Sequence, residues 1–273
     1  MEQKFSVLMS IYIKEKPAYA RACFESLLRQ SVPGAEWVIV EDGPLTQELY
    51  DLLAEYETRY PDLIRRVPLA NNVGLGRALR EGVTHCSYEL IARMDTDDIC
   101  REDRFEKQLQ LFAERPELDI CSSHIQEFHE SPEEIASVRK VPLEEKAILE
   151  YQKRRDSFNH VAVMFKKSAV LQAGNYQHAP LMEDSLLWIN MMRNGARCGN
   201  VDDFLVYVRT GRDMFARRGG WAYFKKYLSG RREIYKTGYI SLWDYWYTLL
   251  VQLVVALLPN GVRRFVFEKL LRN

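Results

Sequence analysis

Three carboxylates crowd into four consecutive positions, Asp95-Thr96-Asp97-Asp98. They follow the apolar segment 88–94, whose pattern predicts a buried strand. Carboxylates this close repel one another unless a cation or several hydrogen-bond donors compensate their charge. Mg²⁺ and Mn²⁺ prefer oxygen ligands and keep further positions for water and substrate phosphates. The segment therefore predicts a metal–phosphate site. The plainer interpretation is the acidic start of a helix over 103–115, although Asp103 is placed to cap that helix itself.

Strands and helices alternate along the first part of the chain and must position these residues. The predicted strands are 5–12, 37–41, 64–67 and 88–94, and the predicted helices are 17–30, 47–60 and 76–82. Continuous apolar strands alternating with helices indicate an α/β fold with a parallel, doubly wound sheet. Ligands bind such sheets beyond the carboxyl ends of the strands. Asp42, which ends the second strand, and the acidic segment are therefore expected to converge on one site.

The second part of the chain is less regular. Strands are predicted at 119–124, 160–165 and 200–209, a helix at 183–194, and a polar loop containing a helix at 130–155. A strongly basic stretch, 212–232, and an apolar, aromatic stretch, 241–258, follow the last strand. We therefore expect a domain over residues 1–210 and a helical C-terminal extension over residues 211–273.

The net charge of zero conceals a division of charge along the chain. Residues 204–273 contain 13 Lys and Arg against 4 Asp and Glu, a balance of +9, so residues 1–203 carry −9. A basic tail on an acidic body indicates an anionic partner for the tail. The five cysteines are scattered and show no CxxC spacing, which favours a reducing cytoplasm over a zinc site or a disulfide framework. Residues 1–11 lack the features of a signal peptide.

Five short motifs, taken in order, resemble the family 2 glycosyltransferases of the GT-A fold. They are Ser10-Ile-Tyr12, Val40-Glu-Asp-Gly-Pro44, the segment 72–79, the segment 92–98 and Met182-Glu-Asp-Ser-Leu-Leu-Trp188. The resemblance covers about residues 4–210, and 93–98 together with 103–108 is especially similar to bacterial polysaccharide-assembly members. It implies a Rossmann-like, mostly parallel central sheet flanked by helices.

The resemblance also implies roles on the side of the sugar donor. Asp42 would accept the N3–H of uracil, and Asp95 would lie near the ribose. Ser10 and Tyr12 would line the base pocket. Asn72 and Arg77 belong to the glycine-containing helix start that faces the phosphates, since helix N-termini accept anions. This chain has Ala78-Leu79-Arg80 where the family commonly has Ala-Arg-Asn, and Arg77 would supply the missing donor. The alternatives are that Asp42 caps the turn before Gly43 and that Tyr12 is a core aromatic.

A later aspartate of the acidic segment should bind the metal that bridges the two phosphates. Asp97 and Asp98 are both candidates, with Asp97 favoured, and the expected ion is Mn²⁺ or Mg²⁺. Its charge would stabilise the departing nucleoside diphosphate. Many relatives place a histidine after the last strand, whereas residues 207–213 contain none. Arg209 and Arg212, with Arg217 and Arg218, are an alternative clamp for the diphosphate, so metal dependence is less firmly indicated than metal binding.

The resemblance places the catalytic base in the pair Glu183-Asp184 at a helix start. Asp184 would take the proton from the acceptor hydroxyl as that hydroxyl attacks the anomeric carbon with inversion. Glu183 and His160 are candidates for the acceptor side. The plainer interpretation is that the two acids complement the positive end of a helix and that His160 is structural.

These residues predict an inverting glycosyltransferase that moves a hexose or N-acetylhexosamine from a UDP-sugar to a hydroxyl of a glycan, or lipid-linked glycan, acceptor. The alternatives are a non-catalytic nucleotide- or carbohydrate-binding module and a nucleotidyltransferase. A nucleotidyltransferase should have a glycine-rich loop after the first strand, yet residues 10–16 contain no glycine. We expect no nucleic-acid partner.

The apolar stretch 242–258 is short for a membrane span, which needs about 20 apolar residues, and it contains Asp244 and Gln252. Basic residues lie on both sides of it. This pattern is typical of a helix lying in the interface of an anionic membrane, where each basic residue contributes roughly 1 kcal/mol. We therefore expect a cytoplasmic protein held peripherally on the inner face of the cell membrane. The alternatives are packing on the catalytic domain and a homo-oligomer interface.

Overall fold

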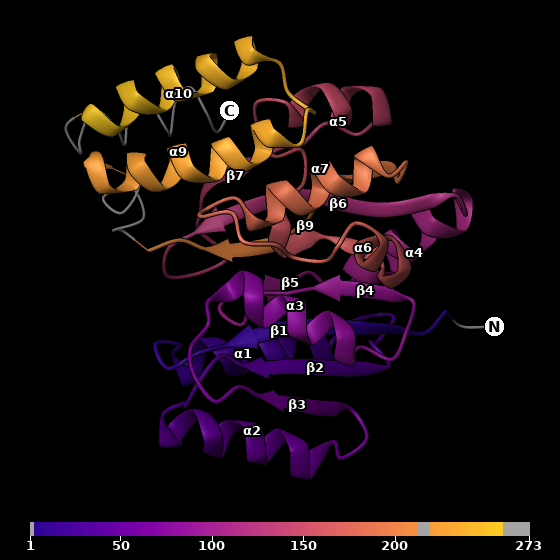
Figure 1. Cartoon of the computed structure of the whole chain (residues 1–273). Helices are drawn as coiled ribbons and strands as arrows, with labels where there is room; N and C mark the ends of the chain where they lie inside the picture. Colours follow the sequence, from indigo (N-terminus) through magenta and orange to yellow (C-terminus); the bar gives the residue numbers. More distant parts are fainter. Residues whose placement is uncertain (1–2, 212–218, 259–273) are drawn as a thin grey trace.

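The computed structural model describes residues 3–211 and 219–258. It is an α/β fold built on a nine-stranded sheet of order β3-β2-β1-β4-β8-β6-β9-β5, with β7 paired to β6 (Figure 1). The strands of the N-terminal half occupy one side of this sheet, and the C-terminal helices lie at the opposite end of the molecule.

The N-terminal half has the predicted alternation of strands and helices. Its elements are β1 (Phe5–Ile11), α1 (Pro17–Leu28), β2 (Glu36–Glu41), α2 (Gln47–Arg59), β3 (Ile64–Pro68), α3 (Leu75–His85) and β4 (Leu90–Arg93). All pairings among these four strands are parallel. Alternate residues of β1 enter two different cores, Val7 and Met9 on the side of α1 and α2, and Leu8 on the side of α3. The predicted doubly wound arrangement is confirmed here.

The second half continues the same sheet with mixed pairing. Its elements are β5 (Ile99–Cys100), α4 (Arg104–Glu114), β6 (Leu118–Phe128), β7 (Ile135–Arg139), α5 (Glu145–Gln152), the 3₁₀ turn η1 (His160–Ala162), β8 (Met164–Lys166), α6 (Lys167–Gln172), α7 (Glu183–Arg193) and β9 (Arg197–Arg209). Strand β8 is antiparallel to both β4 and β6, whereas β6 and β9 run parallel.

Two local predictions differ from the structure of this half. Residues 160–165 were expected as one strand, but Asn159 O accepts the N–H of Ala162 at 2.8 Å, and this closes η1 before β8 begins. The polar segment 130–155 contains β7 in addition to its helix, because the backbone of β7 pairs with the long strand β6. The sheet therefore extends further into the polar segment than its composition indicated.

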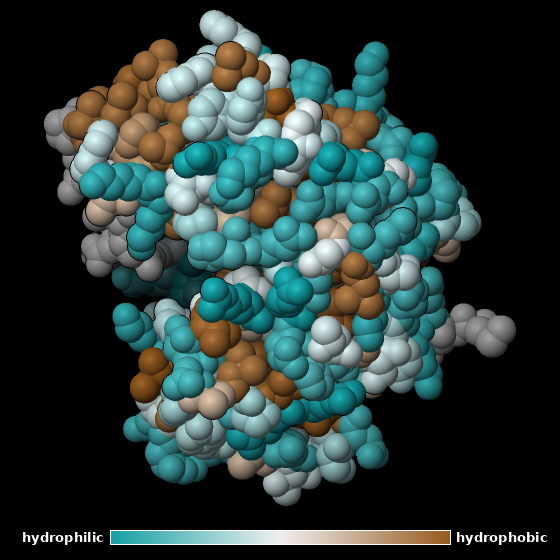
Figure 2. Space-filling view, in the orientation of Figure 1, coloured by the Kyte–Doolittle hydropathy of each residue, from teal (hydrophilic) through white to brown (hydrophobic). Residues whose placement is uncertain are grey.

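Helices α9 (Gly220–Lys236) and α10 (Leu242–Leu257) lie against each other beside α7. Ser241 and Asp244 form a reciprocal capping box that starts α10. Apolar residues gather over α10, in the upper left of the view in Figure 2. Within residues 3–211 and 219–258, every helix is too short or too polar to cross a membrane.

Candidate active site

The acidic segment leaves β4 directly and leads into β5. Oxygen atoms of Asp95, Asp97 and Asp98 all lie within 4.8 Å of one another. Arg93, the last residue of β4, donates to both carboxylate oxygens of Asp95, with Nη1 at 2.8 Å from Oδ2. Asp98 Oδ1 accepts the backbone N–H of Arg209 at 2.7 Å. Two of the three carboxylates are thus already engaged by the protein.

The electrostatics of this cluster call for a cation. Burial, together with the neighbouring charges of Asp95 and Glu15, raises the pKa of Asp97 to about 7. Burial also raises the pKa of Asp98 well above its usual range. Among the residues that the structure describes, the carboxylate of Asp97 has only its own backbone N–H as a hydrogen-bonding partner, and one oxygen of Asp98 accepts no hydrogen bond. Two such hard oxygen donors suit Mg²⁺ or Mn²⁺, so Asp97 and Asp98 are the residues that would hold the ion.

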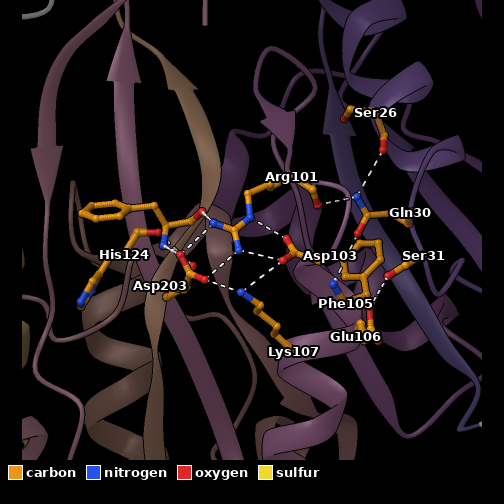
Figure 3. Close-up of polar contacts among 12 residues, drawn as sticks. Ser26, Gln30, Ser31, Arg101, Asp103, Phe105, Glu106, Lys107, His124 and Asp203 are labelled. Atoms are coloured by element: carbon orange, nitrogen blue, oxygen red, sulfur yellow. Dashed lines mark hydrogen bonds and ion pairs between the residues drawn. The ribbon is translucent and has the colours of Figure 1, made fainter. Parts of the chain in front are cut away.

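A four-residue ion network holds the start of α4 against β9 (Figure 3). Arg101 donates two hydrogen bonds to Asp103 and two to Asp203, and Lys107 also binds Asp203. The hydrogen bonds from Arg101 lower the pKa of Asp103 to about 2 and hold that of Asp203 lower still. Asp103 stands at the N-cap of α4 as expected, but its carboxylate makes no capping hydrogen bond and binds Arg101 and Lys107 instead. The network anchors the chain just beyond the acidic segment.

Asp42 and Asn72 meet where β2 ends. The carboxylate of Asp42 accepts the N–H of Val73 at 2.6 Å, the N–H of Gly74 at 3.1 Å and Nδ2 of Asn72 at 3.0 Å. A side chain on Gly43, whose φ is +84°, would place its Cβ 2.6 Å from the backbone nitrogen of Asn72, so only glycine fits. Asp42 therefore organises the turn before α3, which is not the turn before Gly43 that the alternative interpretation had it cap.

Ser10 and Tyr12 lie at the end of β1, beside the acidic segment. The hydroxyl of Thr96 is 3.5 Å from Ser10 O and donates to Glu15 Oε2 at 2.9 Å. Tyr12 is 42% exposed, so the alternative of a core aromatic is wrong. Glu15 is a carboxylate at this site that the sequence analysis did not identify. Burial raises its pKa, and no periodicity in the loop after β1 marked it out.

The two arginines differ in how they are held. The guanidinium of Arg209 stacks over Tyr19 at 4.0 Å and Phe128 at 4.5 Å, and its Nε donates to Asp97 O at 3.2 Å. Arg77 is exposed on the first turn of α3 and makes no hydrogen bond or ion pair with the described part of the chain. Arg212, Arg217 and Arg218 lie outside the described residues.

A cavity of about 360 Å³ lies between the start of α3 and the start of α7. Arg77, His160, Tyr176, Glu183 and Asp184 all contribute to its wall. A Cβ on Gly76 would lie 2.8 Å from Glu183 Cγ, so the glycine lets the two helix starts approach. The structure thus brings the predicted phosphate-side arginine and the predicted base to one cavity.

Asp184 is a carboxylate with an unusual environment. Burial raises its pKa to about 7, and the nearby Asp156 and Glu183 also contribute. His160 Nδ1 lies 3.9 Å from Asp184 Oδ2, and His160 Nε2 is 2.8 Å from the hydroxyl of Tyr176. Burial, followed by the charge of Arg93, lowers the pKa of His160 well below its usual value, so the imidazole is neutral. A carboxyl group with a pKa near neutrality, beside a neutral imidazole, is suited to general-base chemistry.

Arg93 was not identified from the sequence, yet its charge acts on both the acidic segment and Asp184. Its side chain is 2% exposed and pairs with Asp95. Its positive charge also favours the ionised forms of Asp97, Asp98 and Asp184. A charged residue inside the apolar run 88–94 was the available signal.

Solved structures with the same fold include glycosyltransferases of the GT-A class. One is TarS residues 1–349 of S. aureus in complex with UDP-GlcNAc, with a TM-score of 0.64 and 15% identity, covering 98% of this chain and 72% of that one. Another is the mannosyltransferase PcManGT of Pyrobaculum calidifontis with GDP-Man and Mn²⁺, with a TM-score of 0.65 and 14% identity, covering 96% and 72%. Fold and site together define a glycosyltransferase with a GT-A fold.

The model of glycosyl transferase family 2 matches residues 6–171, and the chain belongs to this family. Three relatives are similar over almost their whole length. An uncharacterized glycosyltransferase of Haemophilus influenzae is 40% identical over 99% of this chain and 100% of its own. The amylovoran biosynthesis glycosyltransferase AmsE of Erwinia amylovora is 38% identical over 97% and 98%. The UDP-Gal:alpha-D-GlcNAc-diphosphoundecaprenol beta-1,3-galactosyltransferase of Escherichia coli is 35% identical over 99% and 97%. The protein is thus a glycosyltransferase of polysaccharide biosynthesis, as the motifs predicted.

Proposed function

We propose that the protein is a metal-dependent, inverting hexosyltransferase. It transfers a hexose or N-acetylhexosamine from a UDP-sugar to a hydroxyl of a lipid-linked glycan in the synthesis of a cell-surface polysaccharide. The observation that carries the proposal is Asp184, a half-buried carboxylate with a pKa of about 7 that shares a cavity with Arg77. Residues 1–210 form the catalytic domain in this proposal, and residues 211–273 form the extension that meets the acceptor's membrane.

In the proposed reaction the acceptor hydroxyl enters the cavity and donates a hydrogen bond to Asp184. The hydroxyl oxygen attacks the anomeric carbon from the face opposite to UDP, the bond to the diphosphate breaks, and the proton passes to Asp184. His160, which is hydrogen-bonded to Tyr176, is neutral and therefore does not place a competing cation beside that carboxylate. Glu183 lies beside the entering acceptor. One inverted glycosidic bond and one UDP result.

The donor site uses the residues where β1, β2 and β4 end. Ser10, Tyr12 and Asp42 would receive the uracil, and Asp95 the ribose. Asn72 and Arg77 would face the diphosphate, and Arg209 would support the adjoining backbone. A divalent ion, Mn²⁺ or Mg²⁺, held by Asp97 and Asp98 would neutralise charge on the leaving diphosphate.

The named relatives support the choice of donor and acceptor. The E. coli relative is named for UDP-Gal and a diphosphoundecaprenol-linked sugar, and TarS was solved with UDP-GlcNAc. The Mn²⁺ in the PcManGT complex supports the choice of metal, although its nucleotide is GDP. We favour UDP because the relative with 35% identity is named for a UDP donor.

The apolar face of α10 supports a peripheral membrane location, in the cytoplasm and on the inner face of the cell membrane. Six side chains on this helix are each more than half exposed: Leu242, Trp243, Trp246, Leu250, Val254 and Leu257. Lys225, Lys226, Arg232 and Lys236 of α9 are exposed as well. An apolar, aromatic face next to a basic helix suits an anionic lipid surface better than a neutral one.

Two experiments test these proposals. The first measures UDP released from a panel of UDP-sugars, with and without a lipid-linked acceptor and with and without Mn²⁺. Acceptor-dependent release from one UDP-sugar, giving a product of inverted configuration, is expected. Release from GDP-sugars alone would contradict the choice of donor.

The second experiment tests the membrane surface with phosphatidylglycerol-containing vesicles in a flotation assay. A Trp246→Ser, Leu250→Ser double variant should lose most of its flotation, whereas Leu171→Ser, on α6, should float like the wild type because Leu171 is an exposed leucine on another helix. Equal flotation of all three proteins would remove the membrane role. A change in oligomer size in the double variant would favour the homo-oligomer alternative.

A further inference from the structure

The turn that delivers Asp184 has a strained backbone. Leu181 has a φ of +65°, a conformation that a branched side chain adopts only when its surroundings impose it. The N–H of Met182 closes the turn by donating to Ala179 O at 2.8 Å. Helix α7 and its first-turn residue Asp184 follow at once. The position of the base therefore depends on whatever holds residues 179–182.

Helix α9 presses directly on this turn through Gly230. A Cβ on Gly230 would lie 2.3 Å from Pro180 O and 3.2 Å from Met182 Cγ. Glycine is disfavoured inside a helix, and here its lack of a side chain allows a contact between two backbones. Apolar packing continues from this contact. One apolar cluster contains residues of the turn, of α7, of α9 and of the segment between α9 and α10. Its members are Ala179, Met182, Leu186, Ile189, Ile234 and Ile240.

A second connection reaches Asp184 from the other side, through the segment after α5. Arg231, 3% exposed, donates to Lys153 O. Arg154 Nε donates to Asp244 Oδ1 of α10 at 2.7 Å. The same segment carries Asp156, whose carboxylate accepts the hydroxyl of Ser185. The N–H of Ser185 in turn donates to Asp184 Oδ1 at 2.8 Å.

We propose that the helix pair α9–α10 positions the catalytic base, and that Gly230 and Arg231 are the positioning residues. This inference rests on the proposed role of Asp184. Gly230 sets how closely α9 approaches the turn before Asp184. Arg231 binds the segment whose Asp156 accepts a hydrogen bond from Ser185. The surface that meets the acceptor's membrane is therefore also the support of the residue that deprotonates the acceptor.

The first test is Gly230→Ala, with Ser229→Ala as its matched control. Ser229 is the preceding residue on the same helix and is exposed, so the control also places an alanine on α9, but away from the turn. Gly230→Ala should lower kcat roughly 10- to 100-fold, as expected for a displaced catalytic group, and leave the KM for the UDP-sugar within about twofold. Ser229→Ala should match the wild type. A normal kcat in a folded Gly230→Ala protein would overturn the proposal.

Arg231 provides a second, independent pair of variants. Arg231→Met keeps most of the buried volume but cannot donate to Lys153 O, whereas Arg231→Lys can. The Met variant should lose kcat by about 10-fold without a change in donor KM, and the Lys variant should recover a measurable part of it. Equal kcat values for the Met and Lys variants would show that the hydrogen bond does not position the base.

Hydrogen exchange separates a failure of this inference from a failure of the proposed function. Backbone amides of residues 181–187 should exchange faster in Gly230→Ala and Arg231→Met than in Ser229→Ala, whatever the reaction is. Unchanged exchange would overturn the positioning role even if the enzyme proves to be a glycosyltransferase. Faster exchange in a protein that releases no UDP would retain the positioning contact and contradict the proposed donor.

Discussion

Arg93 and Asp95 form an ion pair in which both terminal nitrogens of the arginine bind both carboxylate oxygens, while the arginine side chain is 2% exposed. This pair stands where β4 ends and the acidic segment begins, and the charge of Arg93 also acts on Asp184. Because Arg93 already offsets the charge of Asp95, the other two aspartates have the greater need of a metal ion. Asp97 and the second oxygen of Asp98 are therefore the candidate metal ligands.

Asp97→Asn should abolish most of the metal-dependent gain in UDP affinity, because it removes a charged ligand that forms no ion pair with residues 3–211 and 219–258. We expect at least a tenfold rise in the Kd for UDP in Mn²⁺, measured by calorimetry. In EDTA the variant and the wild type should bind UDP equally. Asp95→Asn is the comparison. It should destabilise the fold, since it leaves Arg93 buried without its partner, and should change the metal dependence less.

If EDTA leaves both UDP affinity and turnover of the wild type unchanged, the metal assignment is wrong. The clamp by basic residues after β9 would then be favoured.

Asp184→Asn should lower kcat roughly 10²–10⁴-fold and leave the affinity for UDP unchanged, because the amide cannot accept the proton. In the wild type, kcat/KM should rise with pH up to about 7 and then level off, following ionisation of Asp184. Assays of the rate of UDP release across pH 5–9 measure both effects. Near-normal turnover of the variant would exclude Asp184 as the base and direct attention to Glu183.

The same substitution should stabilise the fold at alkaline pH. The pKa of Asp184 is raised to about 7 in the folded protein from a usual 3.8, so the unfolded chain binds fewer protons between these values. The free energy of unfolding therefore falls as pH rises from about 4 to about 7. Asp184→Asn should be more stable than the wild type by roughly 1–3 kcal/mol at pH 8 and by little at pH 4. Urea denaturation at the two pH values measures this difference.

Asp62→Asn is the control for that experiment, because Asp62 is exposed and the chemical change is the same. It should leave the free energy of unfolding within about 0.5 kcal/mol of the wild type at both pH values. Equal stability of Asp184→Asn and the wild type at pH 8 would contradict the raised pKa.

The sequence predicted the N-terminal half of the fold because its strands and helices carry strong local periodicity. The same reasoning located Asp42 and the acidic segment at strand ends, where the structure has them. It could not predict that the carboxylate of Asp42 binds the turn at 72–74, since that contact joins residues about 30 positions apart. It also missed the contact of Glu15 with Thr96 and the contact of Gly230 with Pro180, because both form only when distant segments pack together.

The prediction of a helical extension was confirmed for the described residues, because periodicity and the Ser241–Asp244 cap are local signals. The contacts of that extension with α7 depend on tertiary packing, and no local sequence pattern predicts them.

The last prediction concerns Arg101, whose four hydrogen bonds to Asp103 and Asp203 join α4 to β9. Arg101→Met should lower the free energy of unfolding by roughly 1–3 kcal/mol at pH 7, because two close carboxylates lose their shared partner. The pKa values of both aspartates are lowered in the folded protein, to about 2 for Asp103, so this stability is present above about pH 4 and is lost as pH falls through about 2. The difference between variant and wild type should therefore shrink at pH 2.5 in urea denaturation.

Arg21→Met is the matched control, since Arg21 also makes two hydrogen bonds to one carboxylate, that of Glu55, but the pair is 47% and 45% exposed. It should cost at most about 1 kcal/mol. Equal losses for the two variants would mean that the Arg101 network is no more than a surface ion pair.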